Sequence, residues 1–211
     1  MESLISFLKS AFNNSMPGQQ AQMKMMPRIK NSMDRFSIDA KKGAKKGAVL
    51  LLLYRKDGKI YFPLTQRHEY DGAHSGQVSF PGGKVEFGDL SVEHTALRET
   101  EEEIGVPQSS VNVLGKLTDL FIIASNFNVQ PVIGFLEKAP DFTIDTHEVA
   151  EVIEISIDQL LDDSLQKEKE IVFINKIKIE APYFDFNGYH VWGATAMMLS
   201  EFKEILKNFA S

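Results

Sequence analysis

The sequence predicts an α/β fold in which helices cover a mixed β-sheet, with a helical extension ahead of the sheet. Apolar runs of strand length recur through residues 47–179, either continuous or alternating with polar residues. One capped amphipathic stretch interrupts these runs, and another follows them at the end of the chain. Strands that come both before and after a single helix along the sequence favour a mixed sheet over a regular α/β repeat.

Residues 1–40 are predicted to form an N-terminal extension, and residues 41–211 the main domain. The extension begins as one helix and continues as irregular chain, since Pro17-Gly18 and Pro27 interrupt regular structure. It also supplies most of a basic stretch, residues 24–46, in a chain whose net charge is -6. We expect a solvated arm here. The alternative, that the arm helps to hold an anionic substrate, stays open.

Two antiparallel strands open the main domain. Residues 47–54 are almost wholly apolar, which suits a central strand buried on both faces. Asp57-Gly58 is a pair favoured in tight hairpin turns, and residues 59–65 then alternate apolar and polar side chains. A short strand, residues 78–80, leads through a glycine turn into a predicted helix at residues 89–104.

Further strands and two helices complete the predicted fold. The expected strands are residues 111–123, 127–136, 149–157 and 171–179, and the expected helices are residues 159–163 and 192–209. The Ser125-Asn126 turn separates the first two of these strands. Together with the earlier strands they build the mixed sheet that the helices cover.

Composition narrows the classes of function. The chain has no cysteine, which excludes disulfides, thiolate metal sites and a cysteine nucleophile and suits a reducing cytoplasm. Its longest apolar run, residues 48–54, is far shorter than the roughly 20 residues of a membrane-spanning helix. A net charge of -6 argues against nucleic acid as a partner. We therefore expect a cytoplasmic protein that binds neither membrane nor nucleic acid, and a homodimer stays open.

Glutamates gather on one side of the predicted helix at residues 89–104. Glu99, Glu102 and Glu103 stand at i, i+3 and i+4 and fall within an arc of roughly 100°. The opposite side carries the face to be buried: Leu90, Leu97, Thr100 and Ile104. The carboxylates are therefore expected to project away from the core, where their repulsion favours a bound cation. Taken without its context, the same pattern also fits an exposed acidic helix face.

The residues before and within this helix resemble the Nudix box. Phe80-Pro81-Gly82-Gly83-Lys84-Val85-Glu86 is a glycine turn that lets the backbone approach a ligand closely. Arg98-Glu99, Glu102-Glu103 and Gly105-Val106 then follow the pattern Arg-Glu-x-x-Glu-Glu-x-Gly-aliphatic. The resemblance covers about residues 45 to 205 and implies a Nudix hydrolase with an α/β/α sandwich fold.

The spacing around the box is similar to that of one Nudix branch, the coenzyme A diphosphatase-like proteins. One residue more than usual separates the loop from Arg98, and Asp89 stands where a glutamate is usual. The branch carries a further motif upstream of the box. Leu64-Thr65-Gln66-Arg67 and His74-Ser75-Gly76-Gln77 match it here.

The branch implies a substrate, with alternatives. Coenzyme A or its thioesters would be hydrolysed at the diphosphate to 3′,5′-ADP and phosphopantetheine. The upstream motif usually has Ser or Ala at position 68 and Arg at position 72, whereas this chain has His68 and Gly72. ADP-ribose or a dinucleotide therefore stays open as the substrate. A non-catalytic module that senses a nucleotide is a further alternative, against which the intact glutamates argue.

The resemblance also implies a metal site built from oxygen ligands. Glu99 and Glu103 are the expected principal ligands, and Glu102 and the Gly82 carbonyl complete the site. Hard oxygen ligands select Mg²⁺ or Mn²⁺. Such ions screen the diphosphate from the carboxylates and so permit attack by water.

Catalytic roles follow for the remaining box residues. Glu102 is the expected general base, and a glutamate from a distant loop, Glu148 or Glu151, is the alternative. Arg98 is expected to orient Glu99 or Glu102 through a bidentate contact.

Polar side chains flanking the box are expected to bind substrate. They are Arg67, His74, Gln77 and Lys84. Arginine forks match phosphate geometry, which favours Arg67 as a phosphate ligand. A purely structural role for His74 stays open.

Overall fold

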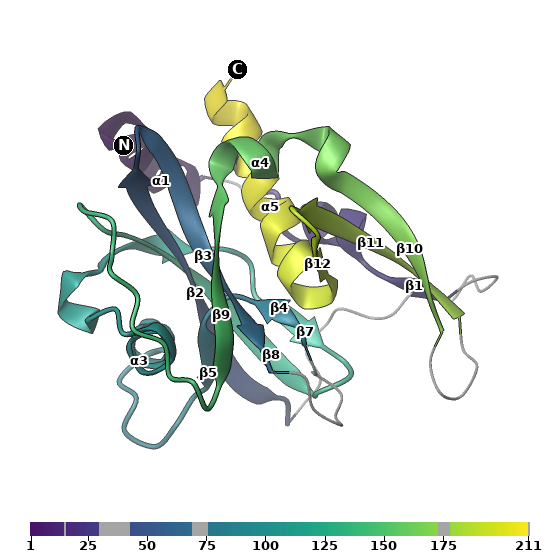
Figure 1. The fold of residues 1–211 in the computed structure, drawn as a ribbon, viewed down its shortest axis with the longest axis horizontal. Helices are drawn as coiled ribbons and strands as arrows, with labels where there is room; N and C mark the ends of the chain where they lie inside the picture. The colour runs from purple at the N-terminus through teal and green to yellow at the C-terminus, as the bar shows by residue number, and fades with distance from the viewer. Residues whose placement is uncertain (15, 30–42, 69–75, 173–177, 211) are drawn as a thin grey trace.

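We describe the protein from a computed structural model, which places residues 1–14, 16–29, 43–68, 76–172 and 178–210. A large mixed sheet is the centre of the fold (Figure 1). Its strands are β2 (Lys45–Lys56), β3 (Lys59–Arg67), β4 (Val78–Ser79), β5 (Gly82–Lys84), β6 (Asn112–Lys116), β7 (Leu120–Ile122), β8 (Phe127–Phe135) and β9 (Val149–Ser156). The order is β4-β3-β2-β8-β6, and β9 pairs with β3, β5 with β2 and β7 with β8. The predicted mixed sheet is confirmed, since β2 and β8 run parallel while β2 and β3 run antiparallel.

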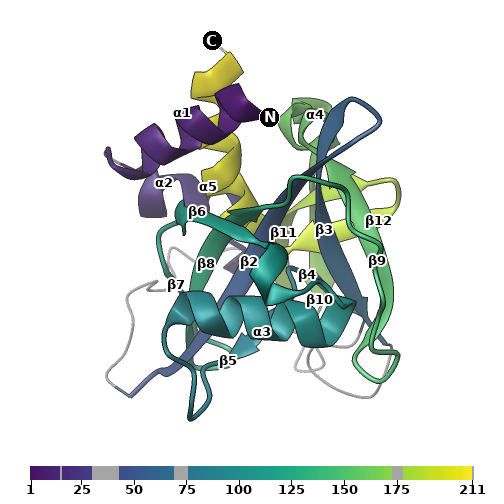
Figure 2. The same cartoon turned by 90° about the vertical axis from the view of Figure 1, so that its left-hand side faces the viewer.

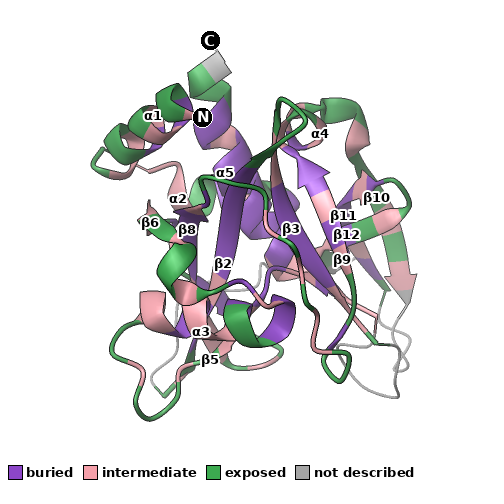
Figure 3. Ribbon diagram, turned by 60° about the vertical axis from the view of Figure 1, so that its left-hand side comes forward, coloured by how far each residue is buried: buried purple, intermediate pink, exposed green. Residues whose placement is uncertain are grey.

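Strand β2 divides the core into two parts. Alternate side chains of a strand point to opposite faces of its sheet. Leu51 and Leu53 join the larger core cluster, whereas Leu50 and Leu52 join the smaller one, and all four are fully buried. Figure 3 shows this burial running along β2 and β3. The predicted two-sided burial of this strand is therefore confirmed.

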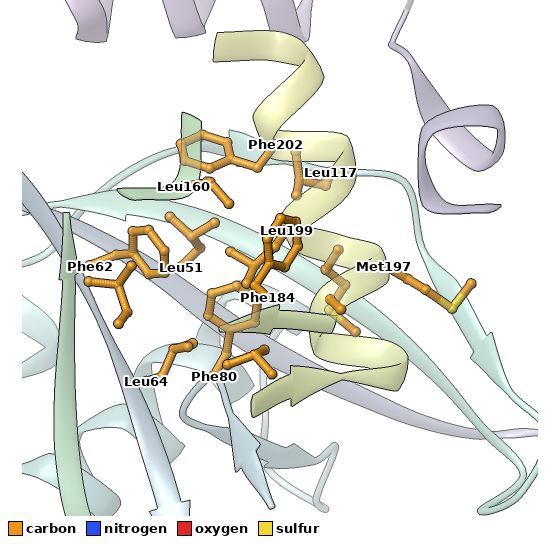
Figure 4. Close-up of a cluster of buried hydrophobic side chains, with 14 of the residues drawn as sticks. Leu51, Phe62, Leu64, Phe80, Leu117, Leu160, Phe184, Met197, Leu199 and Phe202 are labelled. Atoms are coloured by element: carbon orange, nitrogen blue, oxygen red, sulfur yellow. The ribbon is translucent and has the colours of Figure 1, made fainter. Parts of the chain in front are cut away.

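Helix α5 (Gly193–Ala210) covers one face of the large sheet and separates it from a second, smaller sheet (Figure 1). The predicted closing helix at residues 192–209 is thus confirmed. Side chains from both sheets meet α5 in the larger core cluster, where Leu51, Phe62, Phe184, Leu199 and Phe202 are fully buried (Figure 4). No helix in the described ranges is long and apolar enough to cross a membrane.

The smaller sheet is antiparallel and was predicted incorrectly. It contains β1 (Arg28–Ile29), β10 (Gln166–Val172), β11 (Lys178–Phe186) and β12 (Tyr189–Trp192). The single strand expected at residues 171–179 is wrong, because that range joins the end of β10 to the start of β11. Charged residues at 167–170 hide β10 from an apolar pattern, and its pairing with β11 forms it nonetheless.

The N-terminal segment packs as several short elements instead of one helix and irregular chain. These are α1 (Glu2–Phe12), α2 (Gly18–Gln22), the 3₁₀ helix η1 (Met23–Met25) and β1. Leu4, Leu8 and Met25 are buried in the larger core cluster, so the segment shares the core of the main domain. The predicted boundary after residue 40 lies outside the described residues and stays a prediction.

Two further elements differ from their predicted bounds. The strand expected at residues 111–123 is interrupted between β6 and β7, where Glu201 of α5 accepts hydrogen bonds from Thr118. The helix expected at residues 159–163 occurs as α4 (Ile157–Leu161), followed by the 3₁₀ turn η3 (Asp163–Leu165). The capping box of Ser156 and Gln159 explains the earlier start of α4.

Helix α3 (Val92–Ile104) covers the other face of the large sheet and lies across its strands (Figure 2). Its N-cap Ser91 accepts a hydrogen bond from the His94 amide, and Gly105 ends the helix in a left-handed conformation. The buried side chains are Thr95, Ala96, Thr100, Glu103 and Ile104. Two expectations are therefore wrong: Leu90 precedes the helix and is 91% exposed, and Glu103 turns toward the core.

Candidate active site on helix α3

Hydrogen bonds to the Asp89 carboxylate hold the Arg98 guanidinium in place. The Asp89 carboxylate, 2% exposed, accepts hydrogen bonds from Arg98 Nε at 3.0 Å and from Arg98 Nη2 at 3.1 Å. It also accepts from Thr95 Oγ1 and from the Glu86 amide. Arg98 is the main reason that the pKa of Asp89 is held well below its usual range. Asp89 is therefore a permanent anion that orients the guanidinium.

Arg98 in turn holds two of the predicted glutamates. Its Nη1 donates to Glu102 Oε2 at 2.9 Å, and its Nη2 lies 3.0 Å from Glu99 Oε1. Nη2 also donates to the backbone carbonyl of Lys84 in the glycine loop, residues 80–86, which contains β5. The contacts required for the predicted orienting role of Arg98 are thus present, and the role itself stays a prediction. Sequence reasoning had noted Asp89 only as a departure from the box, without assigning it this anchoring contact.

Glu103 is the most unusual carboxylate of the group. Its side chain is 5% exposed, and its Oε2 has no hydrogen-bond partner among the residues that the structure places. Burial raises the pKa of Glu103 to about 8, and the nearby carboxylates of Glu148 and Glu99 add to this rise. Arg67, whose Nη2 lies 3.8 Å from Glu103 Oε1, and the backbone amide of Gly82 oppose it. Without a cation, the site therefore disfavours the charged form.

The glycine loop presses directly on these carboxylates. A Cβ atom added to Gly83 would overlap the carboxyl group of Glu99, so a larger residue here would displace that carboxyl group from its present place. In the pairing of β5 with β2, Leu50 N donates to Pro81 O and Val85 N donates to Lys46 O. Gly82 itself has an irregular backbone, with φ at +151°, and its amide acts on the Glu103 carboxylate. The Gly82 backbone therefore borders the Glu103 carboxylate, and the role of its carbonyl as a metal ligand stays a prediction.

The two alternative bases occupy different places. Glu148 acts electrostatically on both Glu99 and Glu103, raising the pKa of each after the larger contribution of burial. Glu151 instead accepts a hydrogen bond from the Tyr189 hydroxyl at 2.8 Å, toward the smaller sheet. The electrostatic effect on Glu99 and Glu103 therefore favours Glu148 over Glu151 as a member of the acidic group.

The predicted substrate-binding residues are divided among several strands. Arg67 ends β3 and is 40% exposed, and its backbone amide donates to the Gln77 carbonyl at 3.0 Å. Lys84 ends β5 with an exposed side chain, while its carbonyl receives Arg98. His74 lies outside the described residues. Arg67 and Lys84 therefore place cationic side chains on two strands that border the glutamates.

The oxygen atoms that α3 and the glycine loop could offer as metal ligands fit a magnesium-like ion better than a metal that protein ligands enclose on all sides. Within the ranges that the structure describes, no three His, Cys, Asp or Glu side chains form a group that could hold a metal. Mg²⁺ characteristically uses one or two carboxylates and leaves its other positions to water and substrate phosphates. The predicted ligands Glu99, Glu103 and the Gly82 carbonyl would form that kind of partial, all-oxygen set. The unpartnered, buried Oε2 of Glu103 is the observation that supports the fit.

A cavity of about 480 Å³ lies near the C-terminal end of α3, away from these groups. Gly105, Pro107, Lys138 and Asp141 are among the residues that line it, and Glu99, Glu102 and Glu103 are not. We therefore do not assign this cavity to the site.

Known proteins resemble this chain in sequence and in fold. A sequence model of the NUDIX domain matches residues 44–175. Nudix hydrolase 3 of Caenorhabditis elegans is 33% identical over 173 residues, which cover 73% of this chain and 70% of that protein. Nudix hydrolase 22, chloroplastic, of Arabidopsis thaliana is 36% identical over 162 residues. That match covers 74% of this chain and 53% of the Arabidopsis protein, so the chain spans about half the length of this relative.

Solved structures agree at the level of the fold. The crystal structure of a C. elegans Ap4A hydrolase binary complex aligns with a TM-score of 0.53 and 21% identity. The alignment covers 78% of this chain and 99% of that chain. At this identity the likeness concerns the fold alone, and it confirms the predicted sandwich of helices around a mixed sheet. From the matched domain and its relatives, we conclude that the chain belongs to the Nudix hydrolase family.

Proposed function

We propose that this protein hydrolyses the diphosphate bond of a nucleoside diphosphate-linked molecule with the help of Mg²⁺ or Mn²⁺. The observation that carries the proposal is Glu103, a buried carboxylate with an unpartnered oxygen beside two other acids. Such an arrangement costs stability, and a bound cation removes that cost. The absence of cysteine in the chain fits the cytoplasmic setting that we infer for this reaction.

Glu99, Glu103 and the Gly82 carbonyl would hold the ion, and Glu102 would complete the site. A divalent ion supplies charge stabilisation to the diphosphate, which would otherwise be repelled by the glutamates. Arg98 keeps Glu99 and Glu102 in place from one side, and Asp89 keeps Arg98 oriented. Each acid is thus supported before substrate arrives, which lowers the cost of ordering it during the reaction.

Water attacks one phosphorus of the diphosphate, its proton passes to a carboxylate, and the other phosphate leaves. Glu102 is 59% exposed and is our first choice for the proton acceptor. Glu148 is the alternative, supported by its electrostatic contact with Glu99 and Glu103. Arg67 and Lys84 are proposed to bind substrate phosphates, and His74 and Gln77 the remainder of the substrate.

Coenzyme A or its thioesters is the substrate that we place first, with 3′,5′-ADP and phosphopantetheine as products. The upstream motif and the extra residue before Arg98 support this choice. His68 and Gly72 weaken it, because a shorter residue and an arginine are usual at these positions. ADP-ribose and dinucleotides are the next substrates to test.

Incubation of the purified protein with these substrates and MgCl₂ or MnCl₂, followed by product identification, tests the proposal. We expect 3′,5′-ADP and phosphopantetheine from coenzyme A. Cleavage of ADP-ribose or a dinucleotide without cleavage of coenzyme A would overturn the substrate assignment but not the reaction. Binding of a nucleotide without cleavage of any compound would replace hydrolysis by a sensing role.

A further inference from the structure

The turn that carries Glu148 is tied to helix α3 at its first residue. The amide of Asp145 donates to the carbonyl of Glu103 at 3.0 Å. Within the turn, the Asp145 carbonyl accepts from the amides of Glu148 and Val149, at 3.1 and 2.9 Å. The Asp145 carboxylate also accepts from the His147 amide at 2.9 Å. These bonds define the shape of the turn but attach it to the site at one end only.

A second attachment comes from the end of β3. His68 Nε2 lies 2.9 Å from the carbonyl oxygen of Thr146, in the middle of the same turn. A ring N–H at this nitrogen donates to that carbonyl. His68 directly follows Arg67, whose guanidinium lies beside Glu103 and whose backbone pairs with Val149. The last residue of β3 and the residue that follows it therefore contact the buried acid and the turn, respectively.

The strand pairing itself is irregular at this point. The register between β3 and β9 shifts between Gln66 and Arg67, so regular ladder bonds do not continue evenly into the turn. A side-chain bond is then an efficient way to fix the turn. His68 occupies the position at which the coenzyme A motif usually has Ser or Ala, and Ala offers no donor at all.

We propose that His68 is a positioning residue that fixes the Glu148 turn against the glutamates of α3 through its bond to the Thr146 carbonyl. The inference rests on the proposed hydrolysis and extends it, since it gives Glu148 a defined place and assigns a role to a residue outside the box. Glu148 then acts on the reacting water or on the ion beside Glu99 and Glu103. In this proposal His68 contacts neither the reacting water nor the ion, and it acts only by fixing the turn.

Substitution of His68 tests the bond, with His147 as the matched control. H68A and H68F remove the donor, whereas H68Q places an amide N–H at similar reach. We expect H68A and H68F to lower kcat about tenfold with little change in KM, because contacts that orient functional groups typically contribute 10-fold to 100-fold. H68Q should recover most of the loss. H147A removes an exposed imidazole from the same turn and should leave kcat within about twofold of the parent.

A double-mutant cycle with E148Q separates positioning from general destabilisation. If His68 acts through Glu148, H68A should cost little further activity in the E148Q background. An equal loss from H68A in both backgrounds overturns the proposal, as does a parental kcat for H68A.

Hydrogen exchange supplies a readout that does not depend on hydrolysis. The amides of residues 147–149 should exchange about tenfold faster in H68A than in the parent or H68Q, because one stabilising hydrogen bond is lost. Unchanged exchange in H68A would sink this inference alone. Failure of the parent to cleave any diphosphate would sink the proposed function, and the exchange data would still decide whether His68 fixes the turn.

Discussion

Glu103 in α3 and Glu201 in α5 are both buried, and their surroundings are opposite. Glu201 is fully buried and accepts hydrogen bonds from Gln22 Nε2, from the Thr118 amide and from the Thr118 hydroxyl. Glu103 is 4% exposed, has one oxygen without a partner in the described structure, and lies near other carboxylates. Nearly the same degree of burial is therefore compensated by hydrogen bonds to both oxygens of Glu201 and only partly compensated at Glu103.

The difference assigns different roles to the two residues. A buried carboxylate with complete hydrogen bonding joins the segments that supply its donors. Glu201 in this way ties α2 and the β6–β7 connection to α5. A buried carboxylate without such donors destabilises the fold unless a cation arrives. Glu103 is thus the residue at which burial costs stability, and at which we propose that a cation binds.

The largest expected effect is on hydrolysis. Glu103→Gln should lower kcat on the order of a thousandfold, because loss of a bound ion removes several kcal/mol of charge stabilisation. The protein should remain folded. Steady-state assays on the fastest substrate of the panel, with a manganese titration by calorimetry, measure both activity and metal binding.

Glu101→Gln is the matched control on the same helix. Glu101 is exposed and accepts a hydrogen bond from Gln108, away from the site. We expect its activity within about twofold of the parent. Near-parental activity of Glu103→Gln would show that the unpartnered oxygen has no catalytic importance.

The second effect is on stability and belongs to the other glutamate. Glu201→Ala should lower the free energy of unfolding by about 2 to 4 kcal/mol, because the buried donors of Gln22 and Thr118 lose their acceptor. Urea denaturation measures this change. Glu204 lies on the same helix as Glu201 and forms an ion pair with Lys24. Glu204→Gln should lower the free energy of unfolding by less than about 1 kcal/mol. Equal costs for the two variants would contradict the structural role of Glu201.

The third effect is a pH dependence of the metal-free protein. The pKa of Glu103 is about 8 in the fold and near 4.5 when unperturbed, so the fold favours the neutral carboxyl. The stability associated with this group is therefore complete below pH 4.5 and is lost as the pH rises toward 8. The Glu103→Gln variant should not lose this stability as the pH rises. Melting curves in a chelator should lie close together at or below pH 4.5 and separate by several degrees near pH 8, with the variant more stable.

A parent melting temperature that does not fall relative to Glu103→Gln over this pH range would contradict the buried, neutral state of Glu103. Addition of Mn²⁺ at pH 8 should restore the parent and leave the variant unchanged, since only the parent gains a ligand.

The contrast between these regions also explains what the sequence could predict. Helix α3 is specified locally, by the Ser91 cap, the apolar spacing and Gly105, and the sequence revealed both the helix and its glutamates. The burial of Glu103 was missed because it depends on packing against the glycine loop, which no helical periodicity contains.

Long-range pairing accounts for the errors elsewhere. The charged strand β10 exists because β11 pairs with it, and the interruption at Thr118 exists because Glu201 reaches it from α5. In both cases the decisive partner lies far along the chain, beyond any local pattern. Asp89 and Arg98, by contrast, are only nine residues apart in the sequence. The capped first turn of α3 between them was a usable signal for their contact.

The smallest expected effect concerns a third acid, Asp89, which resembles Glu201 in its bonding but lies beneath the site. Asp89→Asn removes a charge that orients Arg98, so Glu99 and Glu102 lose support without losing their own carboxylates. We expect kcat to fall about tenfold, the lower range for residues that orient ligands. Asp89→Glu keeps the charge and should recover most of that activity.

Metal binding distinguishes the two kinds of acid. Manganese affinity in Asp89→Asn should fall far less than in Glu103→Gln, because Asp89 already has hydrogen-bond donors for its charge and needs no cation. A loss of manganese affinity in Asp89→Asn as large as that in Glu103→Gln would contradict this distinction. Complete hydrogen bonding would then not tell an acid that orients other residues from an acid that binds the metal. The comparison of Glu103 with Glu201 would then lose its basis.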